Sequence, residues 1–287
     1  MNVHAISTGT VKITRNWQIG RGPDSLRLLY ALLDTRFTDW LPIYAWVIEH
    51  PEGLILIDTG IPQNANAFTL RPPFMPLVRR AAHFKIESVQ EEVGPKLQQL
   101  GFAAKDVRWV IQTHLHQDHD GGLQYFPKAQ ILIGRDEWNA AQGLKGQLAG
   151  YLNWRWPGWL TPTLVDFAPD PDGIFRGRYT LTRAGDVHLV STPGHSHGHL
   201  SVMLEESDSL IFFAGDTAYR QDLLVAGKVD GVAPDPAAER DSHRRILRLA
   251  AQRAIVYLPT HDPASATRLA ERRKLDVAAQ ADSDKVL

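Results

Sequence analysis

The sequence predicts an α/β fold in one domain spanning residues 1–287. Apolar runs with the length of strands alternate along the chain with segments of helical spacing, a pattern typical of α/β folds. Four of the strand-like runs are followed by histidine or aspartate. A hydrophobic content of 44% and a charged content of 22% are ordinary for a globular protein. A chain of 287 residues can bury a large core within a single domain.

The N-terminal part of the chain is predicted to form two hairpins. Residues 3–6 and 9–13 are the apolar runs of the first hairpin, and residues 43–49 and 54–58 are those of the second. The runs of the second hairpin are joined by His50-Pro51-Glu52-Gly53. Proline and glycine favour turns, so this tetrapeptide is expected to reverse the chain between two strands.

Helices and strands are predicted to alternate in the rest of the chain. Residues 89–100 have helical spacing, and Gly101 is expected to end that helix. Residues 131–134 form a strand, Asp136 is expected to cap the helix that follows, and residues 241–252 form a late helix. The inward-facing positions of the first and last of these helices are Val93, Leu97, Leu100, Ile246, Leu249 and Ala250.

The densest cluster of polar side chains follows a predicted buried strand, VRWVIQ. The next ten residues, THLHQDHDGG from Thr113 onward, hold three histidines and two aspartates. Imidazole and carboxylate are ligands for zinc, iron, manganese or cobalt. Residues two apart on an extended backbone point the same way, so His114 and His116 can bind one ion together. Asp118 and His119 come one turn later and can face a second ion. The alternative is a histidine-rich surface loop.

Three later strand-like runs also lead into candidate ligands. The segments are STPGHSHGH, LIFFAGDT and AIVYLPTHD, and each places histidine or aspartate where the strand-like run ends: His195, His197 and His199 in the first, Asp216 in the second, and His261 and Asp262 in the third. Four strands that bring histidine or aspartate to one edge favour a metal site over a chance cluster.

The ordered motifs resemble the metallo-β-lactamase superfamily. The H-x-H-x-D-H run, the T-P-G-H, the G-D and the late histidine occur in the order expected for that superfamily. The segment LILIDTG, which contains Asp58, is similar to its first motif. The resemblance covers about residues 40–265. It implies a four-layered αββα sandwich with a dinuclear site at the edge where two sheets meet.

The resemblance implies two divalent metal ions per chain, with zinc as the first choice and iron, manganese or cobalt as alternatives. The ligands of one ion would be His114, His116 and His195. The ligands of the other would be Asp118, His119 and His261, with Asp216 as the bridge. Antibiotic-hydrolysing members often have cysteine at the bridging position, and the absence of cysteine from this chain argues against that branch. Hydrogen bonds from Asp58 and His199 are expected to orient the ligands.

Within the superfamily, the chain is similar to N-acyl homoserine lactone lactonases. These enzymes place a tyrosine three residues after the bridging aspartate, and Tyr219 occupies that position. The resemblance implies hydrolytic opening of the lactone ring, with the Tyr219 phenol stabilising the oxyanion and Asp118 passing a proton to the leaving alkoxide. Plain packing over the site is the alternative role for Tyr219. The chain departs from these lactonases at His197 and Asp120, where proline and alanine are commoner.

Three other functions remain open. An organophosphate triesterase or arylesterase would use the same two metals. A thioester hydrolase of the glyoxalase II type would need a basic glutathione-binding patch, for which residues 268–274 are the candidate. A metal-binding scaffold or sensor would bind metal without turnover.

Two segments are expected to be additions to a minimal hydrolase core. Residues 62–84 are rich in proline, and residues 143–160 hold three of the eight tryptophans. We expect these segments to form the wall of a pocket for an apolar acyl chain or a homodimer contact, with plain packing as the alternative. The residues expected to line the pocket are Phe68, Phe74, Met75, Trp154 and Trp156.

Charge and hydropathy argue against other kinds of partner. The net charge of −1 gives no basic imbalance of the kind that a nucleic-acid surface needs. No apolar run is long enough to cross a bilayer. The N-terminal residues lack the basic and apolar blocks of a secretion signal, so we expect a cytoplasmic protein. Disulfides are excluded because the chain has no cysteine.

Overall fold

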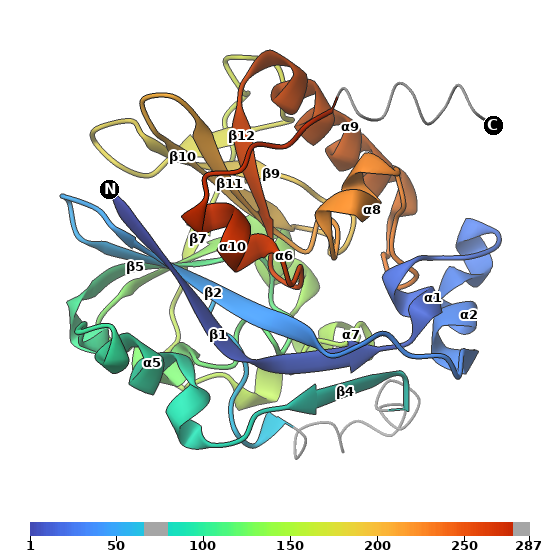
Figure 1. Ribbon diagram of the computed structural model, residues 1–287. Helices are drawn as coiled ribbons and strands as arrows, with labels where there is room; N and C mark the ends of the chain where they lie inside the picture. Colours follow the sequence, from blue (N-terminus) through green and yellow to red (C-terminus); the bar gives the residue numbers. More distant parts are fainter. Residues whose placement is uncertain (66–79, 278–287) are drawn as a thin grey trace.

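Two β-sheets form the centre of the molecule (Figure 1). The computed structural model describes residues 1–65 and 80–277. In these residues the larger sheet contains, from edge to edge, β4 (Ala82–Lys85), β1 (Asn2–Ile13), β2 (Leu41–Glu49), β3 (Leu54–Ile57), β5 (Val107–Gln112), β6 (Gln130–Gly134) and β7 (Thr163–Val165). The smaller sheet contains β12 (Ile255–Pro259), β11 (Leu210–Gly215), β10 (Leu200–Glu205), β9 (Val187–Ser191) and β8 (Arg178–Thr180).

Helices cover the outer faces of both sheets. On the larger sheet, α5 (Val93–Gln99) buries Val93 and Leu97. On the smaller sheet, α9 (Pro236–Gln252) buries Ile246 and Leu249. Figure 1 shows α5 and α9 on opposite sides of the two sheets. The remaining α-helices of the described residues are α1 (Arg15–Gln18), α2 (Arg27–Leu33), α6 (Arg135–Ala140), α7 (Gly143–Leu148), α8 (Gln221–Val225) and α10 (Ser265–Ala270).

The main apolar core lies between the sheets. Side chains from the larger sheet interdigitate there with side chains from the smaller sheet, and all of them exclude water, which is the main source of the stability of such a sandwich. Members of this core include Trp46, Ile57, Ile111, Val202, Phe213 and Val256. The predicted αββα sandwich is therefore confirmed.

Strand direction explains where the polar loops meet. β3 pairs in parallel with β5, and β11 pairs in parallel with β12. Parallel neighbours end at the same edge of a sheet, and in α/β folds loops at the carboxyl ends of strands commonly form the binding site. The loops after β3, β5, β9, β11 and β12 hold the candidate ligands and Asp58. Within residues 1–65 and 80–277, no helix combines the length and the apolar character that a bilayer span requires.

The predicted N-terminal hairpin is wrong. One continuous strand, β1, replaces it, and both of its halves pair with β2. The register shifts between Ser7 and Thr10, where Gly9 has a φ of +134°. A bulge absorbs the one extra residue there, so the glycine interrupts the register without turning the chain. The second predicted hairpin is confirmed, since β2 and β3 are antiparallel.

The helix predicted over residues 89–100 is split. A 3-10 turn, Val89–Glu91, precedes α5, and the residue between them is extended. Pro95 explains the split, because a proline ring in a helix interior clashes with the carbonyl four residues earlier. Asp136 is not a cap, since it lies inside the first turn of α6 after Gly134. The late helix starts at Pro236, earlier than predicted, and the Asp235 side chain caps it.

Candidate metal centre

Seven histidine and aspartate side chains converge at the edge between the two sheets. Four come from the loop after β5, and the others come from the loops after β9, β11 and β12. They form three overlapping groups, and the potential ligand atoms of each group lie within 4.8 Å of one another. The groups are His114, His116 and His195; His114, His119 and Asp216; and Asp118, His119 and His261. The structure thus brings together all seven predicted ligands.

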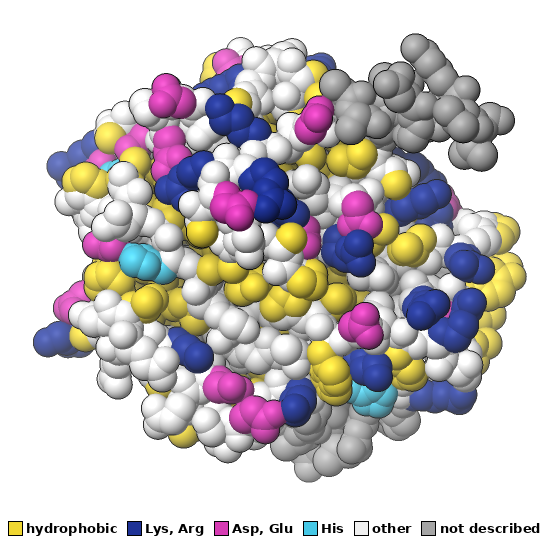
Figure 2. Space-filling view, viewed as in Figure 1, with side chains coloured by type: hydrophobic (Ala, Val, Ile, Leu, Met, Phe, Trp, Pro, Cys, Tyr) yellow, Lys and Arg dark blue, Asp and Glu magenta, His cyan; other side chains and the backbone are white. Residues whose placement is uncertain are grey.

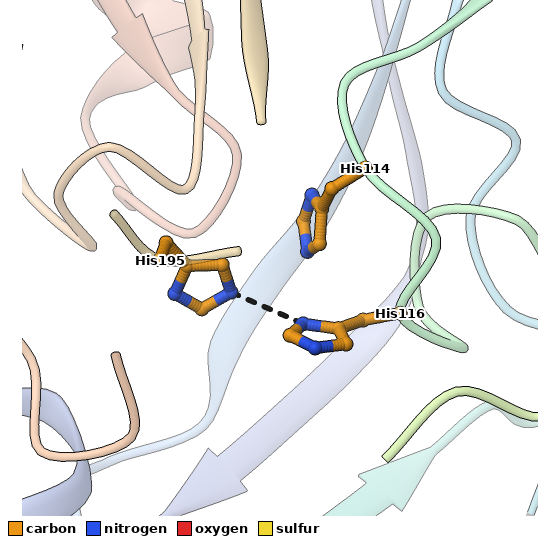
Figure 3. A group of neighbouring side chains, drawn as sticks. All are labelled: His114, His116 and His195. Carbon is orange, nitrogen blue, oxygen red and sulfur yellow. Dashed lines mark hydrogen bonds between the residues drawn. The ribbon is translucent and has the colours of Figure 1, made fainter. Parts of the chain in front are cut away.

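The distances place Asp216 between two sets of ligands. Figure 3 shows His114 and His116 on one loop facing His195 on another, with His116 Nδ1 3.1 Å from His195 Nε2. Asp216 Oδ2 lies 3.5 Å from His195 Nε2 and 3.2 Å from His261 Nε2. Asp216 Oδ1 lies 3.4 Å from His119 Nε2. This carboxylate thus lies between the two sets of candidate ligands.

Unpartnered buried atoms show that the site fits metal ions. Nε2 of His114, His119 and His261 and Oδ1 of Asp216 are buried and have no hydrogen-bond partner among the described residues. A buried polar atom without a partner costs about 1–3 kcal/mol. These atoms belong to two overlapping groups of candidate ligands and are accounted for if divalent cations bind them, since imidazole nitrogen and carboxylate oxygen are suitable ligands.

In His119, His195 and His261, the Nδ1 atom of the ring is hydrogen-bonded to an oxygen. Asp58 Oδ2 accepts from His119 Nδ1 at 2.8 Å, and Asp230 Oδ2 accepts from His195 Nδ1 at 2.6 Å. The Pro42 carbonyl accepts from His261 Nδ1 at 2.9 Å. In the neutral imidazole, such bonds place the proton on Nδ1 and leave the lone pair of Nε2 as the one that could bind metal.

Asp58 and His199 lie where orienting residues are expected. The Asp58 carboxylate also accepts from the Thr113 amide at 2.8 Å, and its φ of +58° is unusual for a residue other than glycine. The hydrogen bonds of the Asp58 carboxylate to Thr113 and His119 therefore hold the backbone of Asp58 and connect the end of β3 to the loop after β5. His199 Nε2 accepts the Asp216 amide proton at 3.0 Å, which fixes the backbone of this candidate ligand.

Burial and nearby carboxylates divide the histidines into two electrostatic classes. Burial lowers the pKa of His114 and His116 well below the ordinary value, so both side chains are neutral near pH 7. Burial also opposes the charge on His119, but Asp216 and Asp58 raise its pKa well above the ordinary value. Carboxylates outweigh burial in the same way at His195 and His261, whose pKa values are also raised.

A cavity of about 480 Å³ opens onto this cluster. Its polar floor includes His116, Asp118, His195, Asp216 and Tyr219. Apolar side chains from β1, α1, α2, β4 and the segment after α7 form most of its wall, among them Val11, Ile13, Trp17, Leu32 and Phe84. Leu28 and Leu148 are 54% and 58% exposed at the cavity rim. Figure 2 shows hydrophobic side chains at the right-hand edge, where Figure 1 places α2.

The predicted pocket residues need correction. Trp154 and Trp156 do not line this cavity. The Trp156 ring stacks on Trp138 at 5.0 Å, and its indole donates to Asp120 Oδ2 at 2.6 Å. It therefore packs against the sandwich, and the same insertion reaches the cavity through residues 148–152 instead. The other predicted pocket residues, Phe68, Phe74 and Met75, lie outside the described residues.

Tyr219 lies over the ligand cluster. Its ring stacks on His261 with centroids 5.4 Å apart and meets His195 edge-on at 6.0 Å. Its phenol oxygen accepts the Trp17 indole N–H at 2.9 Å. Burial, reinforced by the Asp216 carboxylate, raises the phenol pKa well above its ordinary value, so Tyr219 keeps its proton.

Two acidic residues that sequence reasoning missed hold the ligand loops in place. Asp230 is the partner of His195 described above. Glu137 is fully buried and accepts from the Leu115 amide at 3.0 Å, the Ser196 hydroxyl at 2.7 Å and the Gly198 amide at 3.0 Å. It thus ties together the loops after β5 and β9. Neither residue belongs to a motif, and the sequence offers no signal that separates them from other acids.

The model of the metallo-beta-lactamase superfamily matches residues 38–261. The chain belongs to this superfamily. An N-acyl homoserine lactonase of Bacillus thuringiensis is 26% identical over 237 residues, covering 77% of this chain and 82% of that protein. An N-acyl homoserine lactonase of Bacillus cereus is 29% identical over 197 residues, which is 63% of this chain and 66%, just under two thirds, of that protein. A probable metallo-hydrolase of Mycobacterium tuberculosis is 30% identical over 182 residues, covering 62% of this chain and 57% of that protein.

Solved structures share the fold of this chain. One is an N-acyl homoserine lactone hydrolase with the product N-hexanoyl-L-homoserine bound at its catalytic metal centre. It has a TM-score of 0.74 and 23% identity, with 92% of this chain and 94% of that chain covered. A dizinc quorum-quenching lactonase has a TM-score of 0.62 and 16% identity, with 92% and 88% covered. The predictions of the superfamily, the sandwich and a metal-dependent hydrolase are confirmed.

Proposed function

We propose that this chain is a dinuclear metal-dependent lactonase that opens the ring of N-acyl homoserine lactones. The observation that carries the proposal is the cavity, which combines a polar floor of candidate ligands and Tyr219 with a largely apolar wall. A substrate with a small polar ring at one end and an acyl chain at the other matches this division. The names of the Bacillus relatives agree with the same substrate class.

The apolar wall supplies binding energy for the acyl chain. Each methylene group removed from water contributes about 0.8 kcal/mol. Ile13, Leu32 and Phe84 offer such a surface inside the cavity, and Leu28 and Leu148 extend it to the exposed rim. The wall therefore favours longer acyl chains and keeps bulk water away from the lactone.

Two divalent ions held by the seven side chains would supply water that is deprotonated near neutral pH and a Lewis acid for the carbonyl. The residues of this chain do the rest. The neutral Tyr219 phenol donates to the carbonyl oxygen as negative charge develops there, a contact that strengthens in the transition state. The Asp118 side chain is 13% exposed, against 3% for Asp216, and can carry a proton to the leaving alkoxide. Because the product is a hydroxy acid, no separate leaving molecule forms.

The alternative thioester hydrolase receives less support. Three of the four basic side chains in residues 268–274 are engaged with acids. Arg268 pairs with Asp262, and Arg272 pairs with Glu206. Arg273 likewise pairs with Glu271. They therefore do not offer a free basic patch for glutathione. A phosphotriesterase would use the same seven candidate ligands, so only an assay separates it from a lactonase.

A paired assay on metal-analysed protein tests the proposal. Acid release from N-hexanoyl and N-decanoyl homoserine lactone is compared with hydrolysis of a dialkyl aryl phosphate by the same preparation. The proposal predicts a higher kcat/KM for the lactones and a large loss of kcat in Tyr219→Phe. A higher kcat/KM for the phosphotriester would favour the triesterase. Metal binding without turnover of either substrate would favour the scaffold.

A further inference from the structure

We propose that Trp17 is a positioning residue for Tyr219: its indole N–H holds the phenol so that the phenol proton points into the cavity. This inference rests on the proposed function and deepens it. It assigns to α1 a part in the chemistry beyond forming the wall of the cavity. None of the sequence motifs includes this helix.

The chemistry of indole fixes the direction of the hydrogen bond. The Trp17 Nε1 atom lies 2.9 Å from the Tyr219 phenol oxygen. An indole nitrogen can donate but cannot accept. The phenol oxygen must therefore accept, and its own proton cannot point toward Trp17.

The position of the Tyr219 ring leaves the hydroxyl few other orientations. The ring is stacked on His261 at an interplanar angle of 28° and meets His195 edge-on, so its plane is fixed by two neighbours. A phenol proton prefers the plane of its ring and has two orientations there, and the indole N–H disfavours whichever of them directs the proton toward Trp17. Among the described residues, Trp17 is the hydrogen-bond partner of this phenol. The remaining orientation is available to a substrate carbonyl in the cavity, which both residues line.

Accepting a hydrogen bond also makes the phenol a better donor. Linked hydrogen bonds polarise one another, and the effect is larger where water is excluded. Tyr219 is 5% exposed, so the link from the indole through the phenol to a carbonyl would lie in such a place. An aromatic wall alone would not need the N–H, because phenylalanine buries a similar surface.

The backbone of α1 is fixed independently of the Trp17 side chain. The Trp17 carbonyl accepts the Gly231 amide proton at 2.8 Å, and the Gly20 amide donates to the Val229 carbonyl at 2.9 Å. A Cβ atom at position 231 would lie 1.9 Å from the Asn16 carbonyl oxygen, so only glycine permits this approach. The preceding residue, Asp230, holds His195. One loop therefore places both the His195 ring and the helix that carries Trp17.

A double-mutant cycle separates positioning from wall formation. Trp17→Phe keeps an aromatic wall and removes the N–H. It is expected to lower kcat for N-hexanoyl homoserine lactone about tenfold, the worth of one hydrogen bond, with little change in KM. In the Tyr219→Phe background, Trp17→Phe is expected to leave kcat unchanged. The matched control is Leu32→Val, which trims the wall and should raise KM by the same factor in both backgrounds.

An isosteric replacement keeps the test independent of packing. β-(3-Benzothienyl)alanine at position 17 retains the shape of the indole and lacks the N–H, so it should reproduce the kcat of Trp17→Phe with the unaltered Tm and metal content. An equal loss of kcat in the Tyr219→Phe background would overturn the inference, as would an isostere with unaltered kcat. Full kcat in Tyr219→Phe would overturn the role of Tyr219 and, with it, that of Trp17. Absence of lactone turnover by the unaltered protein would instead refute the proposed function on which both rest.

Discussion

Replacing Asp230 with asparagine is expected to put the proton of His195 on the wrong ring nitrogen. Asp230 Oδ1 accepts the amide protons of Val232 at 2.8 Å and Ala233 at 2.5 Å. In Asp230→Asn the amide oxygen must keep these two donors, so the NH₂ group takes the place of Oδ2 and faces His195 Nδ1. Two donors cannot face each other, so the ring proton moves to Nε2. That nitrogen, 3.1 Å from His116 Nδ1, can then no longer bind metal.

The size of the effect follows from the role of such partners. Loss of the group that orients a ligating histidine costs about 10–100-fold in metal affinity, or about 1.4–2.7 kcal/mol. Competition with a chromogenic chelator measures this affinity for zinc. The loss should be confined to the ion of the group that contains His114, His116 and His195.

Asp235→Asn is the matched control. It removes the same charge from the same loop. Asp235 caps α9 by accepting the Ala238 amide proton at 2.9 Å, and the side-chain oxygen of asparagine can accept the same proton. Its zinc affinity should equal that of the unaltered protein. Equal weakening in both variants would mean that net charge, and not the tautomer of His195, sets the affinity. Unaltered affinity in Asp230→Asn would refute the reasoning outright.

Three other perturbations test separate parts of the site. Metal uptake by metal-free protein should release protons near neutral pH, and the affinity for metal should fall as the pH falls, because nearby carboxylates raise the pKa values of His119, His195 and His261. Calorimetry in two buffers of different ionisation enthalpy counts the released protons. Zero release would contradict these pKa directions. Each methylene added to the acyl chain should lower KM about fourfold while the apolar wall is being covered, and a KM independent of chain length would remove the acyl role of the cavity. Gly231→Ala should lower both Tm and kcat because its Cβ would collide with the Asn16 carbonyl. Gly158→Ala, where a Cβ has open space, should change neither. Unaltered kcat in Gly231→Ala would show that the close approach of α1 to the loop at Gly231 is not needed for catalysis.

The candidate ligands could be predicted because each follows a strand directly. An apolar run fixes a strand, and the residue types after it reveal the chemistry. His114 to His119 and the later His195, Asp216 and His261 satisfy both conditions, and the order of the motifs, which resembles the superfamily, selected them from the neighbouring histidines and aspartates.

The orienting residues could not be predicted because their partners are distant in the chain. Trp17 and Tyr219 are 202 positions apart, and His195 and Asp230 are 35 apart. Neither Trp17 nor Asp230 lies in a motif, and only the folded structure joins them to the site. The prediction that Trp156 lines the pocket was wrong for a different reason. Composition indicates that this side chain is buried, but it does not show against which surface.

The dependence of lactone opening on metal content tests the central claim most directly. Metal is removed by chelation, the protein is titrated with zinc or cobalt, and acid release from N-hexanoyl homoserine lactone is measured against the metal bound per chain. A dinuclear lactonase predicts no turnover without metal and a rate that saturates near two ions per chain. Full turnover without metal, or lactone turnover absent at every loading, would contradict it.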